Sequence, residues 1–267
     1  MLSLLRIEWM KVKNYRTFWI LLGITLISIP AVNYMLYDMM NNSFPKVKGK
    51  SILGSPFAFP DVWQTVSWNA GVLFLVPAIL IITHTTNEFV YKTHRQNIID
   101  GWSRNQFIQV KLVEVLLLSV LTTLIVLLTA LGFGYLGNTV SPGISVWQDF
   151  RFVGFYFVQM LDYSLIAFVL AFLVKRSGLA IGLFLVYMLV EKVIVGIGRY
   201  KFKLSFVDYL PEQVTGGLIP QPYLKFIVPA DKVAEWEHHI PYYLVGGALY
   251  VAIYCILTSR WFYRSDL

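Results

Sequence analysis

The sequence predicts an all-α membrane protein with six transmembrane helices, an N-terminal interfacial helix and a short cytosolic helix between spans two and three. The first observation is composition: 57% of the 267 residues are hydrophobic and only 14% are charged, whereas about a quarter of the residues of an average soluble domain are charged. The second is clustering, because the apolar residues form six runs of roughly 18 residues or more, long enough to cross a bilayer as helices. These runs lack the alternating polarity of membrane barrel strands.

The six predicted spans are separated by segments rich in polar and turn-forming residues. They cover residues 18–37, 66–83, 112–136, 152–174, 179–198 and 242–259. Pro30 and Pro77 fall inside the first two spans, where the missing N–H group of proline predicts kinks. Because the sequence shows no internal repeat and no hydrophilic domain-sized segment, we predict a single membrane domain over residues 1–267.

Residues 1–17 are predicted to form an interfacial elbow helix ahead of the first span. Leu2, Leu5, Trp9 and Val12 recur at helical spacing. Such a helix lies in the headgroup layer with its basic residues near anionic lipid. The alternative is a positively charged flank that only orients the first span.

Three loops are predicted on the outer side of the membrane. They cover residues 38–65, 137–151 and 199–241. The last loop is the longest. Its aromatic residues and prolines predict a compact cap of short helices on the membrane surface rather than a disordered segment.

The distribution of charge predicts which side of the membrane is cytosolic. The net charge is +7, and 12 of the 22 lysines and arginines fall in the segments that are cytosolic if both termini are inside, although those segments are the shorter ones. The tight turn at Lys175-Arg176 is the clearest contribution to this bias, which predicts a multi-pass protein with cytosolic N- and C-termini. Nucleic acid is not an expected partner, because the basic residues flank membrane spans.

The loop between spans two and three carries two signals for the start of a helix. Residues 93–96 and 103–106 each begin with Thr or Ser and end with Gln. This is the capping-box pattern, in which both side chains satisfy free backbone amides. Since Gly101 is a typical helix stop, the pattern predicts an isolated helix of about seven residues that ends at Asp100, followed by the start of span three.

This short helix is expected to expose apolar side chains on the cytosolic side. Ile98 and Ile99 follow His94 and Arg95, and exposed apolar residues next to charge mark contacts with lipid or protein. Docking of the helix into a groove of a partner fits this pattern. The alternative is a connector that rests against the cytosolic ends of the other helices.

The same loop resembles that of the ABC-2 type transporter permeases, the six-span subunits that pair with a separate ATP-binding protein. Members include permeases linked to bacitracin and lantibiotic resistance, copper-site maturation and gliding motility. Their loop has an acidic residue, a short helix opened by a small polar and a basic residue, a turn, and Ser-Arg with a Lys seven residues beyond. The matching residues are Glu88, Thr93, Arg95, Ser103-Arg104 and Lys111. The chain departs at the turn, where Asp100-Gly101-Trp102 replaces the usual Leu-Pro-like residues.

The resemblance extends over the whole chain and implies that residues 93–100 form a coupling helix seated in a cleft of the ATPase. It implies a second permease chain, identical or related, in a bacterial cytoplasmic membrane, with lipid around both. It also implies export of an amphipathic, peptide-like or lipid-like substrate. The implied contact residues for the ATPase are Glu88, Thr93, His94, Arg95, Gln96, Ile98, Ile99, Asp100 and Arg104.

No ATP site is expected in this chain. A phosphate-binding loop needs a first glycine five residues before the Gly-Lys-Ser triplet. The triplet Gly49-Lys50-Ser51 has Phe44 at that place and falls in a predicted outer loop. We therefore expect no cofactor and no enzyme activity here, with ATP and Mg²⁺ bound by the partner ATPase.

Three charged residues fall inside predicted spans: Asp162, Glu191 and Lys192. Ionisable groups within a bilayer are costly unless they are paired or face water. The turn between spans four and five places Asp162 and residue 191 at equal depth, so an ion pair between Asp162 and Lys192 is expected, with Glu191 left to another partner. The pair is either a structural bridge or part of a polar patch on a substrate path, and Lys192 can otherwise extend to the outer surface.

Two other classes of protein share this composition. A membrane-embedded hydrolase would need clustered ligands or a nucleophile motif. His84 lies four residues before Glu88 and near His94, and residues 235–239 hold a second His/Glu group, but neither matches a metal-ligand spacing, so no metal site is expected. A non-transporting scaffold or immunity protein would differ in having no ATPase partner.

Overall fold

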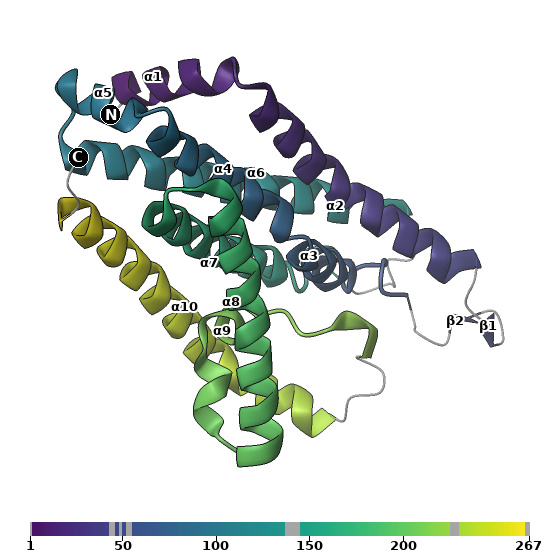
Figure 1. Ribbon diagram of the computed structural model, residues 1–267. Helices are drawn as coiled ribbons and strands as arrows, with labels where there is room; N and C mark the ends of the chain where they lie inside the picture. Colours follow the sequence, from purple (N-terminus) through teal and green to yellow (C-terminus); the bar gives the residue numbers. More distant parts are fainter. Residues whose placement is uncertain are drawn as a thin grey trace.

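The computed structural model describes residues 2–42, 46–47, 50–51, 55–136, 145–224 and 230–264. In these ranges the chain is helical apart from a small antiparallel ribbon of β1 (Lys46–Val47) and β2 (Lys50–Ser51). Figure 1 shows long helices arranged as one bundle, which confirms the predicted all-α class. Parts of the three predicted outer loops, together with Phe44 and Gly49, lie outside the described residues.

Among the described residues, five helices are long and apolar enough to cross a membrane: α2 (Arg16–Asn42), α6 (Arg104–Leu136), α7 (Arg151–Val174), α8 (Ser177–Ile197) and α10 (Ala230–Arg264). The sixth predicted span is a pair of shorter helices, α3 (Val62–Val72) and α4 (Leu75–Val90), whose axes meet at 47°. The protein is therefore a multi-pass membrane protein with up to six spans.

The break between α3 and α4 follows from Pro77. A proline cannot donate to the carbonyl four residues earlier, and its ring crowds that group. The carbonyl in question belongs to Leu73, the residue that follows α3, whose own N–H donates to Ala70 O at 3.0 Å. The helical pattern resumes with the N–H of Ala78, which donates to Phe74 O at 3.1 Å. The predicted kink at Pro77 is confirmed by the 47° bend between α3 and α4. Pro30, by contrast, lies inside α2, which continues as a single helix.

Helix α7 is the centre of the bundle. It contacts α3, α4, α6, α8, α9 and α10. In its most apolar stretch of 18 residues, 61% is buried, against 6% in the corresponding stretch of α10. Ala167 and Ala171 on α7 are fully buried and let neighbouring helices approach closely, in keeping with the small residues that line helix contacts in membranes. Large apolar side chains such as Ile27, Leu128 and Leu189 point out of the bundle instead, as lipid-facing residues do.

Two short helices lie at one end of the bundle. These are α1 (Leu2–Lys13), which runs along the end of the long helices, and α5 (Thr93–Ile99), between α4 and α6. Figure 1 shows both at the same end as the last turns of α10. The predicted elbow helix and the predicted short helix are therefore both present.

The last predicted outer loop contains short helices, as expected, but it is not only a surface cap. They are η1 (Gly198–Phe202), η2 (Ser205–Tyr209), α9 (Pro211–Gly216) and η3 (Pro222–Leu224). α9 contacts both α7 and α10, and Val214 and Thr215 on it are fully buried. The segment thus folds back into the bundle. This arrangement is allowed inside a membrane because its backbone is covered by protein.

Candidate functional site

Beneath α5, a group of charged and polar side chains joins four helices. We call it the junction network, and it comprises Glu8 and Lys11 on α1, His84 and Glu88 on α4, Asn97 on α5, and Lys111 and Glu114 on α6. Lys111 lies at its centre with a fully buried side chain. Its Nζ is 2.6 Å from Glu8 Oε2, 3.0 Å from Glu88 Oε1 and 3.2 Å from Glu114 Oε2.

Lys11, which is partly exposed on α1, extends the network from the buried Lys111 to α5. Its Nζ lies 2.7 Å from Glu8 Oε1 and 3.3 Å from Glu88 Oε1, and it donates to Asn97 Oδ1 at 3.2 Å. Glu8 and Glu88 therefore each contact both lysines. Because a buried charge is tolerated when it is paired and hydrogen-bonded on several sides, this arrangement fixes α1, α4, α5 and α6 relative to one another.

The start of α5 is held by two contacts to Glu88 and one to Phe89. Thr93 Oγ1 donates to the Glu88 carboxylate. His94 Nδ1 donates to the Glu88 carbonyl oxygen at 2.8 Å, and the His94 ring lies 4.9 Å from that of Phe89. His94 and Asn97 are buried, so one side of this short helix is part of the bundle.

One of the two predicted capping boxes is present and the other is not. The N–H of Ser103 donates to Gln106 Oε1 at 2.8 Å, and the N–H of Gln106 donates to Ser103 Oγ at 3.2 Å. At α5 the prediction was wrong, because Thr93 bonds to Glu88 instead and Gln96 donates to Asp100 Oδ1 at 2.9 Å. The predicted stop is confirmed, with α5 spanning seven residues to Ile99 and Gly101 at φ +98°.

The opposite side of α5 is exposed. We call it the α5 surface, and it comprises Tyr91, Lys92, Arg95, Gln96, Ile99 and Asp100. Ile99 is 77% exposed and Tyr91 is 69% exposed. The predicted ATPase-contact set thus divides: Arg95, Gln96, Ile99 and Asp100 belong to this surface. The remaining members, Glu88, Thr93, His94, Ile98 and Arg104, are buried or half-buried and position the helix.

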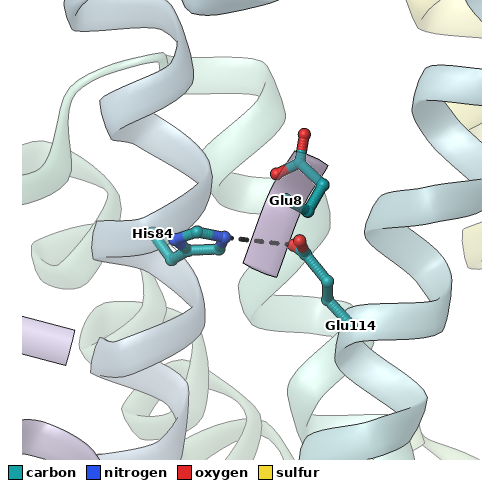
Figure 2. A group of neighbouring side chains, drawn as sticks. All are labelled: Glu8, His84 and Glu114. Atoms are coloured by element: carbon teal, nitrogen blue, oxygen red, sulfur yellow. Dashed lines mark ion pairs between the residues drawn. The ribbon is translucent and has the colours of Figure 1, made fainter. Parts of the chain in front are cut away.

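Three side chains of the network have the donor types of a metal site. Glu8, His84 and Glu114 bring one ligand atom each to within 4.8 Å of the others. Figure 2 shows His84 and Glu114 pointing toward each other, with His84 Nε2 3.1 Å from Glu114 Oε2 and Glu8 beside them. The ammonium of Lys111 lies within 3.4 Å of all three. A divalent ion would have to displace it, so the donor set fits the lysine and not a metal ion.

The intramembrane charges have different partners from those expected. Asp162 Oδ2 accepts from Thr215 Oγ1 at 3.1 Å, and Lys192 Nζ lies 3.2 Å from Glu212 Oε1. Both partners lie on α9, so the expected ion pair between Asp162 and Lys192 is wrong. The reason is the folded-back loop, which supplies a polar partner to each of the two side chains.

Glu191 holds the start of α9. Its Oε1 accepts from the backbone N–H groups of Glu212 at 2.6 Å and Gln213 at 3.3 Å. The first amides of a helix have no partner within the helix. A buried carboxylate from α8 supplies one here. Asp162 Oδ1 and Glu212 Oε2 lack a hydrogen-bond partner among the described residues.

Sequence reasoning did not include several of these residues. Glu8, Lys11, Asn97 and Glu114 of the network were absent from the predicted set, as were Thr215 and Glu212 of α9. A signal was available for two pairs, because Glu8 and Lys11, and likewise Lys111 and Glu114, are three residues apart and share a helix face. The contacts that these residues make with other helices depend on how the helices pack and have no signal in the sequence.

The comparison with known families adds one finding. Residues 21–267 match the family described as "Protein of unknown function (DUF2705)", and the chain belongs to this family. No curated protein matches the chain.

Proposed function

We propose that this member of the DUF2705 family is the permease subunit of an ATP-driven transporter of the ABC-2 type. In this proposal it lies in a bacterial cytoplasmic membrane with both termini in the cytosol, and a separate ATPase subunit docks on the α5 surface. The observation that carries the proposal is the junction network, which ties an exposed short helix to three other helices of the bundle.

The network suits α5 to the transmission of force. A free helix of seven residues is unstable in water, so the contacts of α5 with the bundle hold it in shape. Asn97 joins it to Lys11 on α1, and Thr93 and His94 join it to Glu88 on α4. A displacement of α5 would therefore reach α1, α4 and, through Lys111, α6 as one unit.

The chemistry of the α5 surface suits a protein groove. Tyr91 and Ile99 supply exposed apolar area, and Lys92 and Arg95 supply positive charge beside it. An apolar residue seated in a pocket with charges at the rim is the usual arrangement when a helix binds in a groove. The matching groove would be apolar at its centre and acidic at its edge.

The remaining parts of the proposal concern the assembly and its substrate. A second permease chain would pack against the exposed apolar faces of α8 and α10. The apolar stretches of these two helices are only 28% and 6% buried within this chain. The substrate would be amphipathic, peptide-like or lipid-like, and it would be exported with energy from ATP and Mg²⁺ bound by the partner.

Co-purification tests the proposal. The chain is expressed with the ATPase encoded next to it, as wild type and as Arg95→Glu/Ile99→Asp. We expect the wild type to retain the ATPase and the variant to lose it. Lys13→Glu is the matched control, because Lys13 is exposed on α1 at the same end of the bundle and does not belong to the α5 surface. An ATPase absent from both wild type and control would contradict the proposal and favour a non-transporting scaffold.

A further inference from the structure

A cavity of about 530 Å³ lies between α1, α2, α4 and α6. Its walls are mostly apolar and include Leu5, Val12, Phe18, Leu22, Leu80 and Leu118. One end is polar, where Glu8, His84, Lys111 and Glu114 of the junction network reach it. Its volume falls in the range of about 300–1,000 Å³ that is typical of small-molecule sites.

The apolar walls indicate an apolar chain as one part of the ligand. Side chains that face an unfilled space of this size lack partners for dispersion contacts, and an apolar group that enters gains them. Trp9 and Trp19 also line the cavity, with ring centroids 6.0 Å apart. Both are partly exposed, so the cavity is open to its surroundings between the elbow helix and the long helices.

The polar end indicates the charge of the headgroup. The network contains three carboxylates, Glu8, Glu88 and Glu114, and two ammonium groups, Lys11 and Lys111. Of these groups, the carboxylates of Glu8 and Glu114 and the ammonium of Lys111 line the cavity, so its lining has two carboxylates and one ammonium. The most accessible carboxylate is Glu114, whose side chain is 21% exposed, whereas Lys111 is 1% exposed. A cationic group therefore gains at this end, and an anionic group is repelled.

We infer that this cavity binds an amphiphile with an apolar chain and a protonated amine headgroup. The amine lies against Glu114, and the chain lies between α1, α2 and α6. The inference rests on the cavity and its charge. It does not depend on an ATPase, because binding is measured on the purified full-length chain alone.

The test uses three probes with the same brominated twelve-carbon chain, because bromine quenches tryptophan fluorescence on contact. The headgroups are a primary amine, a sulfate and an uncharged sugar. We expect saturable quenching by the amine probe at a concentration roughly tenfold lower than by the sugar probe, equivalent to about 1.4 kcal/mol. The sulfate probe is expected to be the weakest. Trp9→Phe/Trp19→Phe is expected to remove the saturable part of the signal.

Two variants separate the headgroup from the chain. Glu114→Gln is expected to make the amine probe no better than the sugar probe. Glu237→Gln, at an exposed carboxylate of α10 that does not line the cavity, is expected to change nothing. Leu118→Phe/Leu121→Phe narrows the cavity without adding a tryptophan and is expected to abolish saturable quenching by every probe. Equal affinities of the three probes for wild type, or unchanged saturable quenching in Leu118→Phe/Leu121→Phe, would overturn the inference. The headgroup series and this double variant decide it even if Glu114→Gln does not fold.

Discussion

Lys111 and Glu88, which are 23 positions apart, form a buried ion pair of 3.0 Å that closes the corner made by α4, α5 and α6. Both residues belong to the loop pattern on which the proposed ABC-2 function is based. The acidic residue at the start of that pattern and the lysine at its end therefore have a physical reason to occur together. They hold the short helix between them against the bundle.

Removing the central cation is expected to destabilise the protein strongly. Lys111→Met leaves Glu8, Glu88 and Glu114 facing one another with one fewer partner. Loss of one member of a buried ion pair costs about 3–5 kcal/mol. Lys111→Arg keeps the charge and is expected to cost less. The melting temperatures of both variants are measured in detergent, with size-exclusion chromatography as the readout of unfolding. Equal melting temperatures for Lys111→Met and wild type would contradict a structural role for this network.

The turn after α5 is expected to require glycine. Gly101 has φ +98°, a conformation that disfavours a side chain, so Gly101→Ala is expected to cost about 1 kcal/mol or more. Gly132 in α6 has open space where a Cβ would stand, and Gly132→Ala is expected to be neutral or to stabilise by up to about 1 kcal/mol. Gly101→Ala should therefore lower the melting temperature, whereas Gly132→Ala should leave it unchanged or raise it.

Asp162 and Lys192 are expected to act independently. In a double-mutant cycle with Asp162→Asn and Lys192→Met, the coupling free energy is expected to be near zero, since the two side chains bind different residues of α9. Lys192→Met alone is expected to cost less than about 1 kcal/mol, because the ammonium is largely exposed. A coupling of several kcal/mol would restore the direct ion pair.

The position of α9 is expected to depend on Glu191. Glu191→Leu removes the acceptor for the N–H groups of Glu212 and Gln213, and each unsatisfied buried donor costs about 1–3 kcal/mol. A cysteine placed at the buried Val214, in a Cys255→Ser background, should resist a water-soluble maleimide and become reactive when Glu191→Leu is added. Glu191→Gln keeps an acceptor oxygen and is the control expected to preserve protection.

The span positions could be read from the sequence because long apolar runs have one structural outcome in a bilayer. α7 begins at Arg151 and ends at Val174, close to the predicted 152–174. The turn at Gly101 and the break at Pro77 were also predictable, since each depends on the covalent structure of a single residue.

What the sequence did not reveal depends on contacts between distant segments. The partner of Asp162 is Thr215, 53 positions away, and nothing local indicates that the last loop folds back to the middle of α7. Lys111 and Glu8 meet across 103 positions. Thr93 Oγ1 could either accept from a backbone N–H of α5, as in a capping box, or donate to a nearby carboxylate. It donates to Glu88, five positions earlier, because the turn between α4 and α5 brings the two side chains together.

Site-specific photo-crosslinking tests the central claim most directly. A photoreactive phenylalanine analogue is placed at Ile99 on the α5 surface and, as control, at Met10, which is exposed on α1. The proposal predicts an adduct with a nucleotide-binding subunit from position 99 and not from position 10. Crosslinks from position 99 only to lipid, or equally from both positions, would contradict a coupling role for α5.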